Sequence, residues 1–405
     1  MPARTDSGPS AGPSELLGPY FLVPQLVALL CQVYWLKPIL DEDEQVTTLA
    51  AMSDRAALWR WFHFDITHPP LHILSLHYWI RFIGHSDSSL RAMSMLLSVV
   101  TLALFYLLAR RFLPRSGAAL VCLLQGASTF YVFYAREARP FSLIALWGIA
   151  TIYLLTGIDG PVTTRRALAY FLLCTALAYT SYVGLLLITC ELLWIAFRIA
   201  AGRAKLLVAG VAGALSICPW AWTMMRPYNG HLMAHLSRLM PGTYAARWAD
   251  IGAFYAHAVA GTFLHHAAYF LLPVAAVAIA PAWRRLLAEP KLQLIVVCAT
   301  FPVVTLHIIA RFSPAYMWAT RHLIVSAALF VLVLVIGIFE HRSAVLRVTL
   351  IAALLVASAL TMVHSVRRYP WGDCCVTRLE RRVPATAFRP TKNRTLGASG
   401  HKNFS

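Results

Sequence analysis

Charged residues are scarce in this 405-residue chain, and their scarcity excludes several classes of protein. Asp, Glu, Lys and Arg make up 13% of the residues and hydrophobic residues 59%, whereas a soluble globular domain has about 25% charged and about 45 to 50% apolar residues. The mean hydropathy is +0.64. These values exclude a soluble enzyme and a disordered nucleic-acid-binding tail, and they predict a polytopic membrane protein.

Cysteines with a recognisable pattern are also missing. None of the eight has metal-ligand spacing, and six lie within apolar runs, where a thiol behaves as a small hydrophobic group. The chain therefore implies no disulfide framework. No small-residue cleavage site follows the first apolar run, so we expect this run to be a retained signal anchor.

The chain has long apolar runs instead. A helix needs about 20 apolar residues to cross about 30 Å of hydrocarbon. The runs predict an all-α membrane bundle of about eleven transmembrane helices, over residues 16–37, 88–110, 116–134, 140–157, 166–183, 184–200, 206–222, 264–283, 291–310, 321–339 and 345–365. Residues 71–84 are also apolar, but this segment is too short to cross and carries two His and one Arg, so we expect a helix lying in the interface.

Basic residues fall on alternate connections between these spans. With residues 1–15 in the cytoplasm, every predicted cytoplasmic loop is basic, as the positive-inside rule expects. The clusters are Arg110, Arg111 and Arg115; Arg165 and Arg166; Arg198, Arg203 and Lys205; Arg284, Arg285 and Lys291; and Arg342 and Arg347. The net charge of +18 is then explained by basic residues in the cytoplasmic loops, and it implies no nucleic-acid partner.

The basic tail, residues 366–405, is the exception to this topology. It carries nine Lys and Arg without apolar periodicity, so we expect it to be poorly ordered. Eleven spans leave the tail outside, although polybasic tails usually face anionic cytoplasmic lipid. The side on which the tail lies is therefore left open.

Acidic residues gather in the first external loop, residues 38–87. Seven of the 17 acids lie between residues 41 and 87, and ionisable loops on a rigid scaffold usually carry binding and catalysis. We therefore expect the active site to lie on the external face of the membrane. The chain divides into a module over residues 16–222 that includes this loop, short amphipathic helices over residues 223–263 that form a lid or a passive cover, and C-terminal spans over residues 264–365.

Several short motifs follow one another along the external side. They are Asp43-Glu44 with Thr47 after the first span, His68-Pro69-Pro70-Leu71 at the interfacial helix, Gly84 and Arg91, the segment YAREARPF from Tyr134 to Phe141, and Arg321-His322 before the tenth span. This order resembles the GT-C membrane glycosyltransferases, and within them the family 39-like branch of protein mannosyltransferase and bacterial lipid-glycan transferase type. Residues 38–145 carry most of the likeness. At Thr180-Ser181-Tyr182 the chain lacks a histidine that the family often has.

The resemblance implies an inverting glycosyltransferase on the external face of the membrane, with a polyprenyl-phosphate sugar as donor and a lipid, glycan or protein as acceptor. The Ala-rich helices favour a bacterial inner membrane. It implies Asp43 as the catalytic acid of the family, with Glu44 and Glu137 as partners, because the attacking hydroxyl must lose a proton. The departing phosphate calls for guanidinium groups. The expected substrate-binding residues are His68, Arg91, Arg136, Arg139, Arg226, Arg238 and Arg321, among which Arg139 and Arg321 are favoured.

Each assignment has a plainer alternative. The acidic DEDE segment is also typical of a solvated turn that caps a helix. Arg91 is compatible with an interface anchor or a pair with Asp87, and His68 with a cap for the interfacial helix. The resemblance fixes no cofactor. A divalent metal ion held by Asp43 and Glu137 is favoured over one held by two histidines four residues apart, namely His68 with His72 or His231 with His235.

Two other functional classes also fit a polytopic chain. A transporter or flippase of an anionic lipid or solute needs ionisable groups in mid-membrane, where Glu191 is the one deep acid of the predicted spans. A polymerase or ligase of surface glycans would use diphosphate-linked donors without the early acidic pair. The acids lie mostly in loops, which favours the glycosyltransferase.

Overall fold

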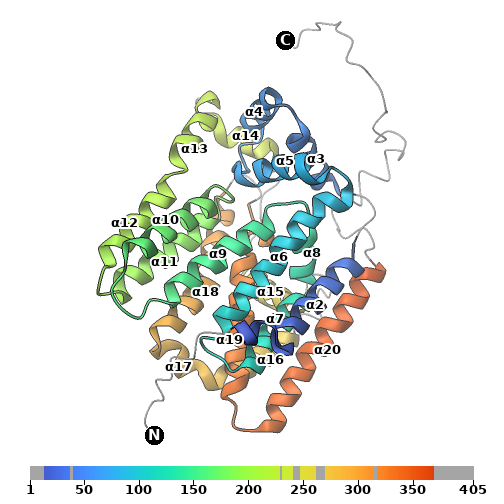
Figure 1. The fold of residues 1–405 in the computed structure, drawn as a ribbon, viewed down its shortest axis with the longest axis vertical. Helices are drawn as coiled ribbons and strands as arrows, with labels where there is room; N and C mark the ends of the chain where they lie inside the picture. The colour runs from blue at the N-terminus through green and yellow to red at the C-terminus, as the bar shows by residue number, and fades with distance from the viewer. Residues whose placement is uncertain are drawn as a thin grey trace, which may run out of the picture.

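The computed structural model describes residues 13–36, 40–228, 230–239, 247–260, 270–313 and 317–368, and all regular secondary structure in these ranges is helical. The predicted all-α class is therefore confirmed. The chain begins with the short α1 (Pro13–Leu16). The remaining helices form a bundle with a cap of short helices at one end (Figure 1).

Every expected span coincides with a helix or a pair of helices. In chain order these are α2 (Pro19–Tyr34), α6 (Asp87–Ala109), α7 (Arg115–Ala127) with α8 (Thr129–Arg136), α9 (Phe141–Thr156), α10 (Thr164–Ala178), α11 (Gly184–Arg198), α12 (Arg203–Leu215) with α13 (Cys218–Met225), α16 (Leu271–Ile279) with α17 (Trp283–Ala288), α18 (Pro290–Phe312), α19 (Ile324–Glu340) and α20 (Ala344–Arg368). Residues 264–269 of the eighth expected span lie outside the described residues.

The chain is an integral multi-pass membrane protein by the length and composition of these helices. Within the described ranges, six helical segments are long and apolar enough to cross, and α7 with α8 makes a seventh if that pair, bent by 65°, is one span. The break falls at Ser128, whose hydroxyl donates to the carbonyl oxygen of Ala258 at 3.1 Å. The total of eleven spans stays a prediction.

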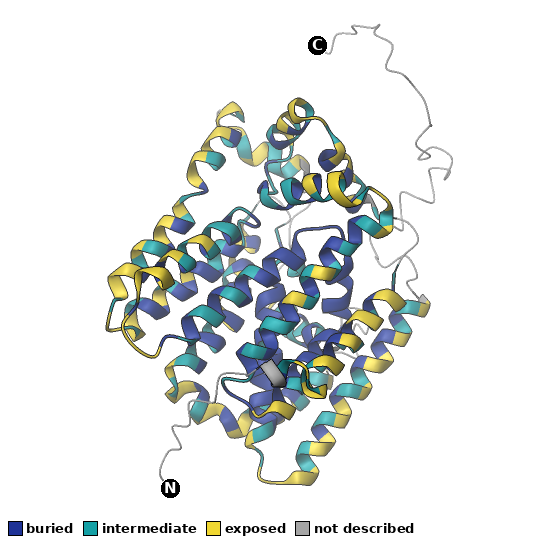
Figure 2. Cartoon of the chain, in the orientation of Figure 1, coloured by how far each residue is buried: buried dark blue, intermediate teal, exposed yellow. Residues whose placement is uncertain are grey.

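Among the candidate spans of the described residues, the one that contains α19 is the most buried, which fits its nearly continuous apolar sequence. Of its candidate span, 83% is buried inside the protein, and the buried residues gather around it at the centre of the molecule in Figure 2. Gly337 shows how close the packing is, because a Cβ added there would lie 2.3 Å from the carbonyl oxygen of Ala278. Only glycine permits this approach of α19 to α16.

The loops predicted to be cytoplasmic lie together at the end opposite the cap (Figure 1). Ion pairs and hydrogen bonds join several of these loops although they are far apart in sequence. The pairs are Arg110 with Glu15, Lys291 with Asp159, Arg285 with Glu340, and Arg285 with the carbonyl oxygen of Phe112. The alternation of basic loops along the sequence is therefore matched by one basic end of the structure.

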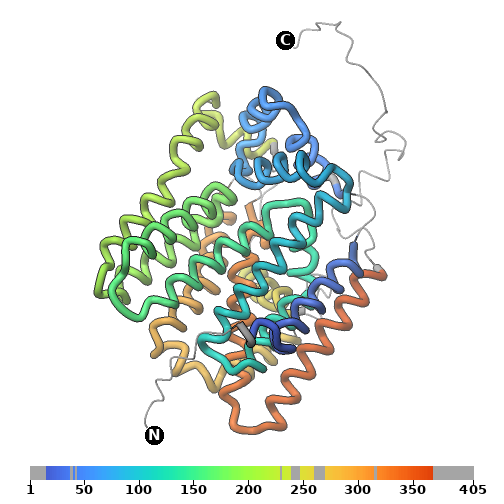
Figure 3. The backbone as a smooth tube through the Cα atoms, in the orientation of Figure 1, coloured from blue at the N-terminus to red at the C-terminus, as the bar shows by residue number. Residues whose placement is uncertain are grey.

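The cap is made of α3 (Glu42–Met52), α4 (Arg55–Phe64), α5 (Leu71–Ile83) and α14 (Leu232–Leu239), which meet at one end of the tube in Figure 3. Asp41 and Asp54 are the N-caps of α3 and α4, each accepting a backbone hydrogen bond at 2.8 Å. The 13 residues of α5 span about 20 Å at 1.5 Å per residue, which is too short to cross.

The segment expected to form one external cover, residues 223–263, divides into two parts. The first, η1 (Arg226–Tyr228) with α14, docks on α4: Tyr228 donates to the carbonyl oxygen of His63, and His235 bonds that of Phe64 at 3.1 Å. The second, α15 (Ala249–Ala260), packs into the bundle core through Phe254 and Val259. The expected position over the cavity is therefore not that of α15, whose apolar side chains are buried against other helices.

Candidate active site

The two adjacent acids of α3 lie in opposite environments. The Asp43 side chain is 61% exposed, whereas Glu44 is fully buried. The Glu44 carboxylate accepts from Arg91 Nε at 2.9 Å, from the Ala138 N–H at 2.9 Å and from the Asp41 N–H at 3.0 Å. Burial raises the pKa of Glu44, but the hydrogen bonds and charge of Arg91, with the two backbone donors, outweigh it and lower the pKa below its ordinary value.

Glu44 therefore connects three parts of the fold through hydrogen bonds. Its partners lie on the N-cap of α3, on α6 and in the turn between α8 and α9. This differs from the role beside Asp43 that the resemblance implies for Glu44, because an enclosed carboxylate with its oxygens occupied is not open to a substrate. It also shows that Arg91 pairs with Glu44 and not with Asp87.

Arg139 connects the turn between α8 and α9 to the exposed acid. Its guanidinium lies 3.2 Å from a carboxylate oxygen of Asp43, donates to Thr47 Oγ1 at 3.0 Å and approaches His68 Nε2 at 3.5 Å. Arg139 is only 5% exposed. Glu137, 6% exposed, lies in the same turn, and its carbonyl oxygen accepts from the Arg139 N–H at 2.7 Å.

His68 is held on its other side by an acid. Its Nδ1 lies 2.8 Å from Asp65 Oδ2, and Thr67 donates to the other oxygen of Asp65. Burial raises the pKa of Asp65, but the hydrogen bond and charge of His68 and the hydrogen bonds of Thr67 outweigh it and lower the pKa to about 2. Polar contacts thus run from Asp65 through His68 and Arg139 to Asp43.

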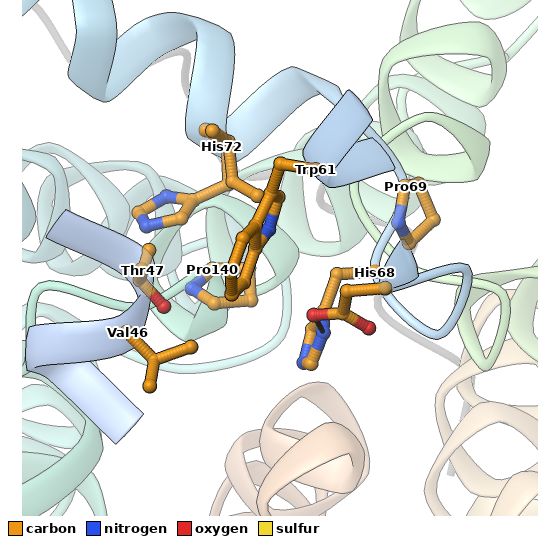
Figure 4. A pocket seen from close by; sticks show the side chains of 9 residues that line it. Val46, Thr47, Trp61, His68, Pro69, His72 and Pro140 are labelled. Carbon is orange, nitrogen blue, oxygen red and sulfur yellow. Dashed lines mark hydrogen bonds and ion pairs between the residues drawn. The ribbon is translucent and has the colours of Figure 1, made fainter. Parts of the chain in front are cut away.

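A narrow cleft opens beside these groups, with a volume of about 10 Å³, which is room for a group the size of one hydroxyl or one water molecule. Its walls are Val46, Thr47, Trp61, Asp65, His68, Pro69, His72, Ile73 and Pro140, as Figure 4 shows for seven of them. His72 is 2% exposed and bonds the carbonyl oxygen of Ala138 through Nε2 at 3.2 Å. Burial lowers the pKa of His72 to about 3.

A further turn of 3-10 helix, η4 (Thr320–Leu323), brings Arg321 and His322 to the same region. The His322 ring centroid lies 5.7 Å from that of Phe141, and the Arg139 guanidinium carbon lies 5.9 Å from the Phe141 ring. Nε of Arg321 is buried and has no hydrogen-bond partner among the described residues. His322 therefore comes near Arg139 through Phe141, and Arg321 precedes it in the same turn.

The other predicted arginines lie elsewhere. Arg136 is fully buried, with its guanidinium carbon 4.9 Å from the Trp35 ring and 5.2 Å from the Phe133 ring, and its nitrogens have no hydrogen-bond partner within the described part of the chain. Arg226 on η1 and Arg238 on α14 are exposed and are not among the described residues that form the cleft walls. Their elements dock on α4 at the edge of the site.

No metal centre is visible in the described ranges, where no three His, Cys, Asp or Glu side chains cluster as metal ligands. The divalent ion expected from Asp43 and Glu137 stays a prediction. Sequence reasoning gave no substrate role to Trp61, His72 and His322, which the structure brings to the site. For His322 the only signal was its position next to Arg321 before an apolar span.

No protein-family model matches the chain, and neither does any curated protein. Solved structures do. ArnT from Cupriavidus metallidurans bound to undecaprenyl phosphate has a TM-score of 0.59 at 13% identity, over 89% of this chain and 66% of that one. The Archaeoglobus fulgidus oligosaccharyltransferase in the apo form has a TM-score of 0.52 at 10% identity, over 86% of this chain and 55% of that one.

The same archaeal enzyme tethered with an acceptor peptide gives a TM-score of 0.52 at 11% identity, over 86% of this chain and 55% of that one. This chain therefore spans about two thirds of the ArnT length and little more than half of the oligosaccharyltransferase. Likeness at these identities shows the fold, and the fold agrees with the one that the sequence motifs predict. The chain therefore has the same fold as ArnT and the archaeal oligosaccharyltransferase, as the resemblance to the GT-C enzymes predicts.

Proposed function

We propose that the protein is an inverting glycosyltransferase that moves a sugar from a polyprenyl-phosphate donor to an acceptor at the cap end of the bundle. One observation carries the proposal: an exposed carboxylate, Asp43, is fixed by the buried guanidinium of Arg139 beside a cleft. The GT-C fold and the undecaprenyl phosphate bound to the ArnT structure support this donor class.

In the proposed reaction Asp43 is the general base. An acceptor hydroxyl attacks the anomeric carbon from the face opposite the phosphate, and its proton passes to the Asp43 carboxylate. The bond from the anomeric carbon to the phosphate oxygen breaks, and the lipid phosphate leaves with the electron pair. The exposure of Asp43 suits this task, since its carboxylate is open to an incoming hydroxyl.

The leaving phosphate gains charge, and cations at the site would stabilise it. Arg139 and Arg321 remain the proposed phosphate-facing groups, because one holds Asp43 and the other has a buried Nε without a partner among the described residues. His68 is proposed to face substrate through the Nε2 edge that Arg139 approaches. Glu44 with Arg91 is proposed to position α3, and Arg136, Arg226 and Arg238 are not proposed to touch the reacting atoms.

The proposed function also determines on which side of the membrane the active site would lie. The basic loops would face the cytoplasm and the cap the exterior, which in a bacterial inner membrane is the periplasm. The acceptor would be a lipid, glycan or protein. Transport gains no support, because the deep acid Glu191 is enclosed by hydroxyl donors from Thr151 and Tyr170 and is thus explained as a structural group.

The test compares cells that contain the wild-type protein, no protein or Asp43→Asn. Mass spectrometry of envelope glycans and lipids should show a glycosylated product in the wild type only. Purified Asp43→Asn should still bind undecaprenyl phosphate in nanodiscs, because the substitution keeps the shape of the side chain. A product that persists undiminished in Asp43→Asn would refute the role of Asp43.

A further inference from the structure

Two buried polar atoms in the cleft walls lack a hydrogen-bond partner among the residues that the structure describes. They are Nδ1 of His72 and Nε1 of Trp61. Both residues line the cleft, His72 from α5 and Trp61 from α4 (Figure 4). The His72 side chain is 98% buried, given its exposure of 2%. Buried polar groups in folded proteins are nearly always paired, so these two atoms are available to a polar group that enters the cleft.

The hydrogen-bonding roles of the two atoms follow from chemistry. Nε2 of His72 lies 3.2 Å from the carbonyl oxygen of Ala138, which can only accept, so Nε2 carries the proton. Burial lowers the pKa of His72 to about 3, so the ring is neutral near pH 7 and Nδ1 presents a lone pair. The indole N–H of Trp61 can only donate. The cleft therefore offers one acceptor and one donor, both uncharged.

We infer that His72 and Trp61 form a subsite for a carbohydrate hydroxyl. Hydroxyl groups both donate and accept hydrogen bonds without carrying a charge, so carbohydrate hydroxyls suit the lone pair of Nδ1 and the N–H of Nε1. A phosphate or carboxylate fits poorly, because an anion is repelled by the Nδ1 lone pair. The Trp61 ring adds an apolar surface on which the C–H face of a sugar can pack, because the indole combines an apolar ring with a polar N–H.

The position of the subsite links it to the transfer reaction. Thr47 lies in the same cleft wall and is bonded to Arg139, which holds Asp43. A sugar that places one hydroxyl in the cleft therefore lies beside the proposed base. This inference rests on the proposed function, and the sugar belongs either to the donor or to the acceptor.

The test measures binding of methyl mannoside, methyl glucoside and methyl arabinoside to the purified protein in nanodiscs by saturation-transfer NMR. His72→Phe keeps a ring but removes Nδ1, and Trp61→Phe removes the indole N–H. Each should weaken binding of the preferred glycoside about three- to tenfold, the usual worth of one neutral hydrogen bond. His72→Gln restores a donor for Ala138 and an acceptor for the ligand, and should recover most of the binding.

The matched control is His77→Phe. His77 lies on the same helix, is 6% exposed and bonds the carbonyl oxygen of Ala51 through Nδ1, but it does not line the cleft. Binding should be unchanged in this variant.

Sugar transfer by His72→Phe and Trp61→Phe would show which substrate uses the subsite. A higher KM for the donor lipid would assign the subsite to the donor sugar, and a higher KM for the acceptor would assign it to the acceptor. Either result supports the subsite.

Two outcomes separate the inference from the proposed function. If Asp43→Asn abolishes transfer while His72→Phe and Trp61→Phe leave glycoside binding and both KM values unchanged, the subsite is refuted and the glycosyltransferase stands. If Asp43→Asn keeps full transfer while glycoside binding depends on His72 and Trp61, the carbohydrate subsite stands and the role of Asp43 falls.

Discussion

The guanidinium of Arg139 lies 3.2 Å from the carboxylate of Asp43, with Arg139 5% exposed and Asp43 61% exposed. A buried cation thus holds an acid that is open to solvent. The planar fork of Arg139 reaches Asp43 and Thr47 at once, which the single ammonium of a lysine does not reproduce.

Arg139→Lys should therefore lower kcat at least tenfold although the positive charge is kept. The geometry of Asp43 is the cause, because a small misplacement of a catalytic group costs much of its effect. Steady-state kinetics in nanodiscs would measure the change, with Arg238→Lys on the exposed face of α14 as control. Unchanged kcat in Arg139→Lys would show that charge alone is needed at this position.

The Glu44–Arg91 pair predicts a loss of stability. Glu44→Gln removes the carboxylate that accepts from the buried guanidinium of Arg91, and breaking a buried ion pair from one side costs about 3 to 5 kcal/mol. Thermal unfolding in detergent should show a clear drop for Glu44→Gln and for Arg91→Met. The double variant should lose less than the sum of the two single variants, because each single variant already removes the same interaction. Strict additivity would mean that the pair is not coupled.

Much of the fold was predictable from the sequence, because long apolar runs and alternating basic loops are local patterns. The expected spans match helices throughout the described ranges, and residues 71–84 form a helix too short to cross. The placement of α15 was not predictable. Its 12 residues are fewer than a span needs and include Asp250 and His257, so they read as interfacial cover.

The site was predictable only in part, because burial depends on contacts that are distant in sequence. Asp43 and Glu44 look equivalent in the motif, and Glu44 becomes structural only through Arg91, 47 residues away. His72 belongs to the cleft because Ala138, 66 residues away, fixes its ring. No local pattern marks these pairings. Arg136 and Arg139 lie in the same motif, and the sequence favoured Arg139 for its position near the membrane interface, but only the structure shows Arg136 buried against Trp35.

The stability of the cap should depend on pH through His72. Its pKa falls from 6.5 to about 3 on folding, so the unfolded state binds more protons between these values. The stability that His72 contributes is complete above pH 6.5 and declines as the pH falls toward 3. The slope should be at most about 1.4 kcal/mol per pH unit.

The window from pH 6.5 to 4.5 isolates His72 from the nearby acids. Asp65 and Glu44 have lowered pKa values, so the stability they contribute is present above 3.8 and 4.5, their ordinary values, and is lost only at lower pH. Thermal unfolding across this window should be flatter in His72→Phe than in the wild type. Equal slopes would show that the buried imidazole does not control acid sensitivity.

The orientation of the bundle can be tested by cysteine labelling in a background without native cysteines. Ser88 is exposed in the first turn of α6 beside the cap, and Gly160 is exposed next to Asp159, which pairs with Lys291 at the basic end. A side chain at Gly160 meets no atom within 4 Å, so neither substitution should disturb the fold.

Because basic loops stay in the cytoplasm, a membrane-impermeant maleimide should label Ser88→Cys in intact spheroplasts and Gly160→Cys only after lysis. The reverse pattern would place the cleft in the cytoplasm and overturn the proposed external site, whereas labelling of both in intact spheroplasts would contradict the spans that separate them.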